Sequence, residues 1–268
     1  MNHTLIDSHC HPPPLAENEA GRLPDWLQGA IECGVSECIA VGTDPDDWSA
    51  HCNLAASYPE HVHWTAGLHP CHVEDDFRSR LELLPPLLEC LEGRRPCALG
   101  EIGLDFTKLS KDIREERAEQ QREAFSTQLQ WAKRFQLPVV IHSRGTVLEC
   151  LEIIQQEGFP AERTLFHCFV EGPETLAKIR AAGAKCSFTG IITFKNAREV
   201  RSSLETNGLE NLILETDSPY LSPEPFRGRR NEPARVSILA DYCADFFGTT
   251  RERIAEITRR NTENFFDF

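Results

Sequence analysis

Histidine and acidic side chains recur in this chain at positions that suit the binding of metal ions. The first group is His9-Cys10-His11, in which two imidazoles stand two residues apart. Residues two apart on an extended strand share a face, so both rings can point at one ion. Four further residues of ligand type lie within or directly after apolar runs, and they are Glu101, His142, His167 and Asp217.

These side chains offer more ligands than one tetrahedral ion uses. Two divalent ions roughly 3.5–4 Å apart, bridged by one carboxylate, would use all of them. Water held between two such ions has its pKa lowered toward neutrality, so the set predicts hydrolysis by an activated water molecule. Imidazole and carboxylate without thiolate suit Zn, Mn, Mg or similar ions and argue against an iron–sulfur centre.

Glu101 is the candidate bridge between the two ions. It lies inside the apolar run 98–104, where an acid is costly unless it is paired or metal-bound. Asp217 is the candidate general base, which would hold the proton of the water and pass it to the leaving group. Our assignment places His9, His11, Glu101 and Asp217 on the first ion, and Glu101, His142 and His167 on the second.

Each of these residues alone has an ordinary structural interpretation. A single His-x-His pair is a weak signal, and an isolated His142 or His167 could be a satisfied core or rim histidine. Asp217 alone could cap a helix before Pro219. The conjunction favours a metal site, because ligand-type residues fall at five different predicted strand ends while the strand interiors are nearly free of them.

Eight short β-type runs alternate with longer helical stretches. The runs are residues 4–9, 37–42, 63–69, 97–104, 138–142, 164–168, 185–189 and 211–216. Most of their centres are continuous apolar sequence, as expected for parallel strands covered on both faces. Helical patterns occupy residues 115–135, 146–156, 173–182, 233–247 and 251–264.

This alternation predicts one α/β domain over residues 1–268, a (β/α)8 TIM-type barrel with residues 251–264 as an extra C-terminal helix. An open doubly wound sheet is the main alternative, but no GxGxxG follows the first run. The carboxyl ends of the strands of a parallel barrel meet at one rim, which would bring the candidate ligands together.

Composition bounds the function further. The chain has 28 Lys and Arg against 42 Asp and Glu, a net charge of −14 that disfavours broad nucleic-acid binding. Its 11 cysteines form no CxxC pair, so we expect free thiols in a reducing cytoplasm. We expect no secretory signal, membrane span or obligate protein partner. Four cysteines beside apolar residues are expected in the core, namely Cys33, Cys38, Cys97 and Cys186.

An ordered set of motifs resembles the TatD-type metal-dependent deoxyribonucleases. The motifs are LIDSHCH from Leu5, GLHP from Gly67, GEIGLD from Gly100, PVVIHSR from Pro138, FHCF from Phe166, SFTG from Ser187, TFKNA from Thr193, ETDSPYL from Glu215 and RNEP from Arg230. The resemblance implies a distorted barrel of the amidohydrolase type, two divalent ions and hydrolysis of DNA phosphodiesters. It implies the same six ligands. The chain departs from the family pattern at Gly145 and at residues 170–172, both on rim loops that bear on substrate preference.

Several residues outside the ligand set could contact DNA as substrate. The basic run 227–230 follows the Asp217 strand in an otherwise acidic chain, although a solvated loop could have the same composition. His69 could bind substrate or simply be a rim histidine. The predicted substrate contacts are His69, Arg144, Lys195, Arg229 and Arg230.

Three functions follow from these observations. The leading one is a deoxyribonuclease, in its narrower form a 3'→5' exonuclease on single strands. The second is hydrolysis of a small amide, lactone or aminoacyl ester at the same dinuclear site. The third is a non-enzymatic scaffold with a structural metal, which is disfavoured because structural sites are normally closed by four ligands.

Overall fold

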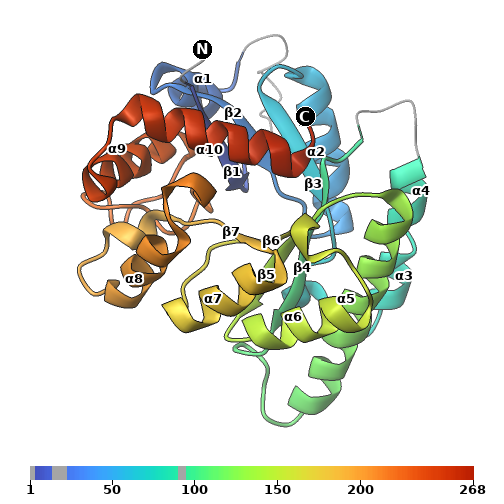
Figure 1. Cartoon of the computed structure of the whole chain (residues 1–268). Helices are drawn as coiled ribbons and strands as arrows, with labels where there is room; N and C mark the ends of the chain where they lie inside the picture. The colour runs from blue at the N-terminus through green and yellow to red at the C-terminus, as the bar shows by residue number, and fades with distance from the viewer. Residues whose placement is uncertain (1–3, 14–22, 90–94) are drawn as a thin grey trace.

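The computed structural model describes residues 4–13, 23–89 and 95–268 (Figure 1). Within them, parallel strands form one curled seven-stranded sheet whose spatial order follows the chain from β1 to β7. The strands are β1 (Leu5–Cys10), β2 (Val35–Ala40), β3 (Val62–Ala66), β4 (Ala98–Asp105), β5 (Val139–Arg144), β6 (Thr164–Phe166) and β7 (Lys185–Cys186). Seven of the eight predicted runs therefore overlap a strand, and the predicted barrel-type α/β fold is confirmed.

The eighth predicted strand, residues 211–216, is wrong as a regular strand, although this segment closes the barrel. On one side Ser8 N donates to Leu214 O at 3.2 Å, and on the other Phe188 N donates to Ile213 O at 3.1 Å. The ladder breaks at Thr216, because its backbone N–H and hydroxyl both donate to the buried carboxylate of Asp7. Side-chain hydrogen bonds thus replace the regular pairing, and the barrel is distorted at this seam.

Helices cover the outside of the sheet (Figure 1). They are α1 (Asp25–Glu32), α2 (Pro45–Ser57), α3 (Phe77–Leu81), α4 (Leu84–Glu89), α5 (Arg114–Phe135), α6 (Val147–Gln156), α7 (Pro173–Ala182), α8 (Arg198–Asn207), α9 (Val236–Phe247) and α10 (Arg251–Phe266). Helix α7 shows why such boundaries are predictable, since Pro173 opens its first turn and Gly183 ends it with φ 96°. The predicted helix 233–247 begins instead as the 3-10 turn η5 (Pro233–Arg235).

The interior of the barrel is a packed core closed at one end by α10. Apolar side chains from successive strands, among them Ile39, Val140 and Ile213, pack with Phe265 and Phe266 of α10. Arg259 of the same helix donates to Thr4 Oγ1 at 3.0 Å, beside the start of β1. Helix α10 therefore covers the amino ends of the strands, so a functional site belongs at their carboxyl ends.

The cysteines in the described residues are free, as expected. Cys38 and Cys186 are buried and Cys97 is partly buried. The prediction of a core position for Cys33 is wrong, because this residue ends α1 before Gly34 and faces solvent. Across the same residues, no helix combines the length and the apolar character needed to cross a membrane.

Candidate metal centre

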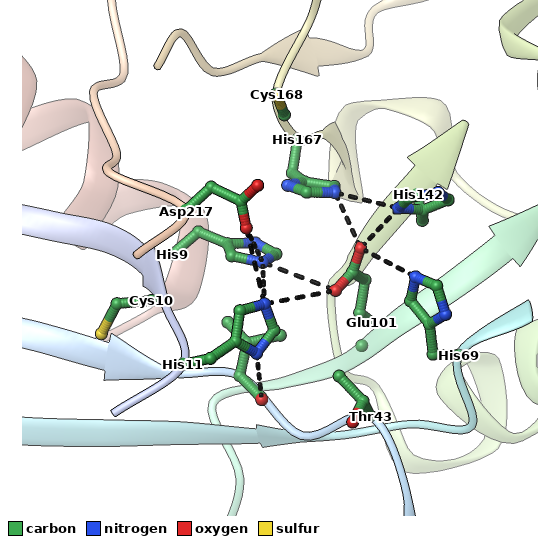
Figure 2. Close-up of polar contacts among 12 residues, drawn as sticks. His9, Cys10, His11, Thr43, His69, Glu101, His142, His167, Cys168 and Asp217 are labelled. Carbon is green, nitrogen blue, oxygen red and sulfur yellow. Dashed lines mark hydrogen bonds and ion pairs between the residues drawn. The ribbon is translucent and has the colours of Figure 1, made fainter. Parts of the chain in front are cut away.

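The carboxyl ends of the strands bring the six predicted ligands together, with Glu101 in the middle (Figure 2). His9 and His11 lie at the end of β1, Glu101 on β4, His142 on β5, His167 just after β6, and Asp217 just after the seam segment 211–216. The segments that carry them are far apart in sequence, and the closed barrel makes them neighbours.

Glu101 is almost completely buried, with 3% exposure, and its two oxygens face two different groups of imidazoles. Oε2 lies 3.5 Å from His9 Nε2 and 3.8 Å from His11 Nε2. Oε1 lies 2.7 Å from both His142 Nδ1 and His167 Nε2. This is the arrangement expected of a carboxylate shared between two cations.

The first group has the spacing of a cation site. His9 Nε2 and His11 Nε2 are 3.3 Å apart, and Asp217 Oδ1 lies 3.8 Å from the former and 3.5 Å from the latter. His11 Nδ1 lies 3.2 Å from the carbonyl of Val41, which needs a proton on Nδ1 and leaves Nε2 with its lone pair. Two nitrogens held 2.0–2.1 Å from a tetrahedral ion are about 3.3–3.4 Å apart, so these donors fit a divalent cation.

The second group repeats that spacing. His142 Nδ1 and His167 Nε2 are 3.3 Å apart. The remaining nitrogens face acids, since His142 Nε2 lies 3.2 Å from Asp105 Oδ2 and His167 Nδ1 lies 3.4 Å from Glu215 Oε1. The second of these is a charge contact rather than an aligned hydrogen bond, because His167 Nδ1 lacks a hydrogen-bond partner within the described residues. Imidazoles that ligate metals are typically oriented by a carboxylate in this way.

Asp105 and Glu215 are functional candidates that sequence reasoning missed. Glu215 is fully buried and accepts from Cys168 N at 2.7 Å and from Ser187 Oγ at 2.6 Å. Asp105 accepts from the backbone and the hydroxyl of Thr107. Both acids are held firmly, and each belongs to a motif that also carries a ligand. An acid inside an otherwise apolar strand end was the signal that could have found them.

His69, which the sequence predicted as a substrate contact, lies beside the ligands. Its Nε2 is 3.4 Å from Glu101 Oε1, and its ring centroid is 4.4 Å from that of His142. Because His69 Nδ1 accepts from Cys71 N at 3.0 Å, the proton of the neutral ring is on Nε2 and is directed at the centre. His69, Glu101 and His142 also form one of the possible metal-binding groups of the described residues.

The electrostatics of the centre keep its carboxylates ionised. Burial raises the pKa of Glu101, but neighbouring imidazoles, His167 and His69 foremost, hold it well below its ordinary value. Burial also raises the pKa of Asp217, but the neighbouring imidazoles, His11 foremost, lower it overall. Burial lowers the pKa of His167, but the charge of Glu101 raises it well above its usual value. A cation at this centre would therefore compete with protons.

Two backbone features explain how the chain reaches this geometry. Gly103 has φ 134°, and a Cβ there would lie 2.1 Å from the carbonyl oxygen of His142, so only glycine allows β4 and β5 to approach beside Glu101. Asp217 has φ 53°, an uncommon conformation that acidic residues tolerate, and its N–H donates to His9 O at 2.9 Å. The backbone thus turns the side chain of Asp217 toward the first group.

The basic residues predicted to contact substrate do not join this cluster. Arg144, Lys195, Arg229 and Arg230 are all exposed, and none forms an ion pair within the described residues. Arg230 lines a pocket together with His11, which places it beside the first group of imidazoles. Arg144 ends β5, two residues after His142.

We expect the purified protein to bind about two divalent ions per chain. Elemental analysis after incubation with Mn, Zn or Mg and removal of free ions checks the number. Ions that bind only the folded state stabilise it, so a chelator should lower the Tm. No more than trace metal under every condition, with an unchanged Tm, would contradict the centre described here.

A parallel barrel that gathers imidazoles around a buried carboxylate defines the class of metal-dependent barrel hydrolases. Residues 6–267 match the family described as TatD related DNase. The chain is 32% identical over 262 residues to the "uncharacterized metal-dependent hydrolase YcfH" of Escherichia coli K12, covering 97% of this chain and 94% of that protein. It is 32% identical over 269 residues to human deoxyribonuclease TATDN3, covering 98% and 94% respectively.

The fold agrees with these sequence relationships. The crystal structure of YjjV, a TatD homologue from Escherichia coli K12, superposes with a TM-score of 0.87 at 29% identity over all of both chains. The chain therefore belongs to the TatD related DNase family, and it is a metal-dependent hydrolase.

Proposed function

We propose that this protein is a deoxyribonuclease whose single domain, residues 1–268, hydrolyses phosphodiester bonds of DNA, in the narrower form as a 3'→5' exonuclease on single strands. The observation that carries the proposal is the position of Glu101, whose Oε2 faces the pair His9 and His11 and whose Oε1 faces the pair His142 and His167. Two-cation sites of this type recur in enzymes that cleave phosphodiesters. The name of the human relative TATDN3 supports DNA as the substrate class.

The donor set fits two divalent cations, because each group pairs imidazole nitrogens 3.3 Å apart with an oxygen of Glu101. Such ions lower the pKa of bound water and neutralise charge on a phosphate. We assign the first cation to His9, His11, Glu101 and Asp217, and the second to Glu101, His142 and His167.

The chain's own residues then handle the proton and the substrate. Asp217 retains 16% exposure of its side chain, and its low pKa keeps it ionised at neutral pH, so it can accept the proton of the attacking water and return it to the leaving oxygen. The Nε2–H group of His69 can donate a hydrogen bond to Glu101 or to a substrate oxygen. Arg230, beside His11, is placed to hold a phosphate.

A pocket on the other side of the centre supports the second candidate function, hydrolysis of a small amide, lactone or aminoacyl ester. This pocket of about 540 Å³ is lined by four acids, Glu74, Asp75, Asp76 and Asp105, against the two cations Lys108 and Arg117. Together with the net charge of −14, these acids would repel a polyanion. They would suit a small neutral or cationic amide, lactone or aminoacyl ester instead.

A salt series separates the two functions. If DNA is the substrate, cleavage of a labelled single-stranded oligonucleotide should weaken as salt rises. Arg229→Ala with Arg230→Ala should flatten the dependence of log KM on log salt by about one unit for each phosphate that the protein no longer neutralises. A double replacement of Arg253 and Arg260 by alanine is the matched control, since both lie on α10 at the opposite end of the barrel and contact Glu210.

The outcomes differ between the two substrates. A neutral ester releases few counterions, so its hydrolysis should respond little to salt or to either double variant. Hydrolysis of a small ester, with no DNA cleavage at any salt or metal tested, would refute the nuclease and leave the second function.

A further inference from the structure

We propose that the pocket beside His11, lined by Trp26 and Arg230, binds the base and the phosphate of a nucleotide that flanks the scissile bond. This inference rests on the proposed nuclease function and assigns it a subsite. The pocket has a volume of about 260 Å³, slightly below the usual range of small-molecule pockets, so it can admit a small group such as one nucleobase. Because His11 belongs to the first imidazole group, the pocket adjoins the position of the chemistry.

Aromatic surface is available on this side of the centre. Trp26, on α1, packs partly against the apolar core and also lines the pocket. Tyr220 is 63% exposed, which is unusual for a large aromatic side chain, and its ring centroid lies 6.5 Å from that of His11. Proteins that bind single-stranded nucleic acids combine basic residues for the phosphates with such side chains, on which any base can stack.

The free charge of the pocket is positive. Arg230 forms no ion pair with any residue that the structure describes. The acid in the lining, Glu232, is engaged by Arg235, with 3.3 Å between Glu232 Oε1 and Arg235 Nη2. A guanidinium without an ion pair among the described residues, together with an aromatic surface in the same pocket, supplies the two features that hold a nucleotide, one for its phosphate and one for its base.

The loop that carries Arg230 is tied to the loop of Asp217. Asn231 Nδ2 donates to the carbonyls of Thr216 at 3.0 Å and Tyr220 at 2.6 Å. Arg235 Nη1 donates to the carbonyl of Arg230 at 2.6 Å. Helix α1, which carries Trp26, packs against the turn η5 that directly follows the Arg230 loop. Trp26 is therefore held next to the same loop. The pocket is therefore positioned rigidly relative to the candidate base.

The other side of the centre has the opposite charge. There the pocket carries four acids, Glu74, Asp75, Asp76 and Asp105, against Lys108 and Arg117, and Arg117 is engaged by Asp75 at 2.7 Å, so the net charge of this pocket is negative. A polyanionic strand would be attracted on the Arg230 side and repelled on the Asp105 side. We therefore expect the protein to hold the nucleotide on only one side of the scissile bond, the side that faces Arg230.

The test uses the full-length protein with metal and a labelled single-stranded oligonucleotide. One base is removed from the strand at a time, at each position near the scissile bond, and kcat/KM is measured for the wild type, Trp26→Ala and Trp26→Phe. Trp131→Ala is the matched control, because Trp131 on α5 is also half-buried against the core but lies outside the pocket.

At one flanking position, removal of the base should lower wild-type kcat/KM by roughly 5- to 150-fold. Trp26→Ala should lower kcat/KM by the same factor on the intact strand, but should cause no further loss on the strand that lacks this base. Trp26→Phe should keep most of the wild-type sensitivity to removal of the base. Trp131→Ala should leave the response to base removal intact.

Two results would overturn the subsite. One is a wild type that cleaves DNA equally fast whichever base is missing, a result that does not depend on any variant folding. The other is a loss in Trp26→Ala that is equal on all strands. In both cases the nuclease function stands. A wild type that neither cleaves nor binds the oligonucleotide would refute both proposals.

Discussion

Replacing Glu101 by alanine is expected to lower hydrolysis more than any other single substitution at the centre, beyond the roughly 100-fold or greater loss that removal of a general base causes. The reason is that Glu101 faces both imidazole groups, with Oε2 toward His9 and Oε1 toward His142 and His167. Its loss removes a ligand from both proposed cations and leaves buried imidazoles without their shared acid. We therefore expect less than one bound ion per chain.

Elemental analysis and kcat, each measured after incubation with excess metal, check this result. Glu101→Gln removes the charge of the side chain but keeps its size. It should resemble the alanine variant, because an amide is a poorer metal ligand than a carboxylate. Glu152→Ala, on the exposed face of α6, is the control for loss of one acidic residue. An alanine variant that kept both ions and normal turnover would show that Glu101 does not bridge them.

Asp217→Asn should lower kcat by about 100-fold or more while the barrel stays folded. Asparagine keeps the size and one oxygen donor but cannot accept the proton of the attacking water. It also tolerates the left-handed backbone found here, φ 53°, so the turn after the seam should be preserved. The larger effect should thus fall on turnover rather than on the Tm.

Single-turnover rates at saturating metal, with circular dichroism as the check on folding, measure this effect. The matched control is Asp241→Asn, which makes the same change at an exposed residue on α9. If Asp217→Asn turned over at a near-normal rate with its metal intact, another group would be taking the proton, and the role assigned to Asp217 would be wrong.

The convergence of the six candidate ligands could be predicted from sequence. Glu101 stands inside an apolar strand and His142 directly follows the apolar residues 139–141 of another. The carboxyl ends of parallel strands must meet at one rim. What could not be predicted is which acids orient the imidazoles. Asp105 and Glu215 reach His142 and His167 only because β4, β5 and the seam lie side by side in the closed barrel.

Ordinary helices and strands followed from local patterns, and the exceptions lie where side chains compete with the backbone. Pro173 and Gly183 bound α7 as such residues commonly do. Residues 211–216 have the composition of a strand, yet the buried carboxylate of Asp7 takes the hydrogen bonds of Thr216. Asp7 is 209 residues away in sequence, so no local pattern could indicate that contact.

The sequence by itself therefore determined the class of fold, the types of ligand and the rim where they gather, because alternation, burial and side-chain chemistry are local properties. The tertiary structure alone decided how the two oxygens of Glu101 are divided between imidazole groups, that His69 points its proton at the centre, and that Trp26 and Arg230 share a pocket with His11. Each of these depends on distances between residues from different strands and loops, and only closure of the barrel sets such distances.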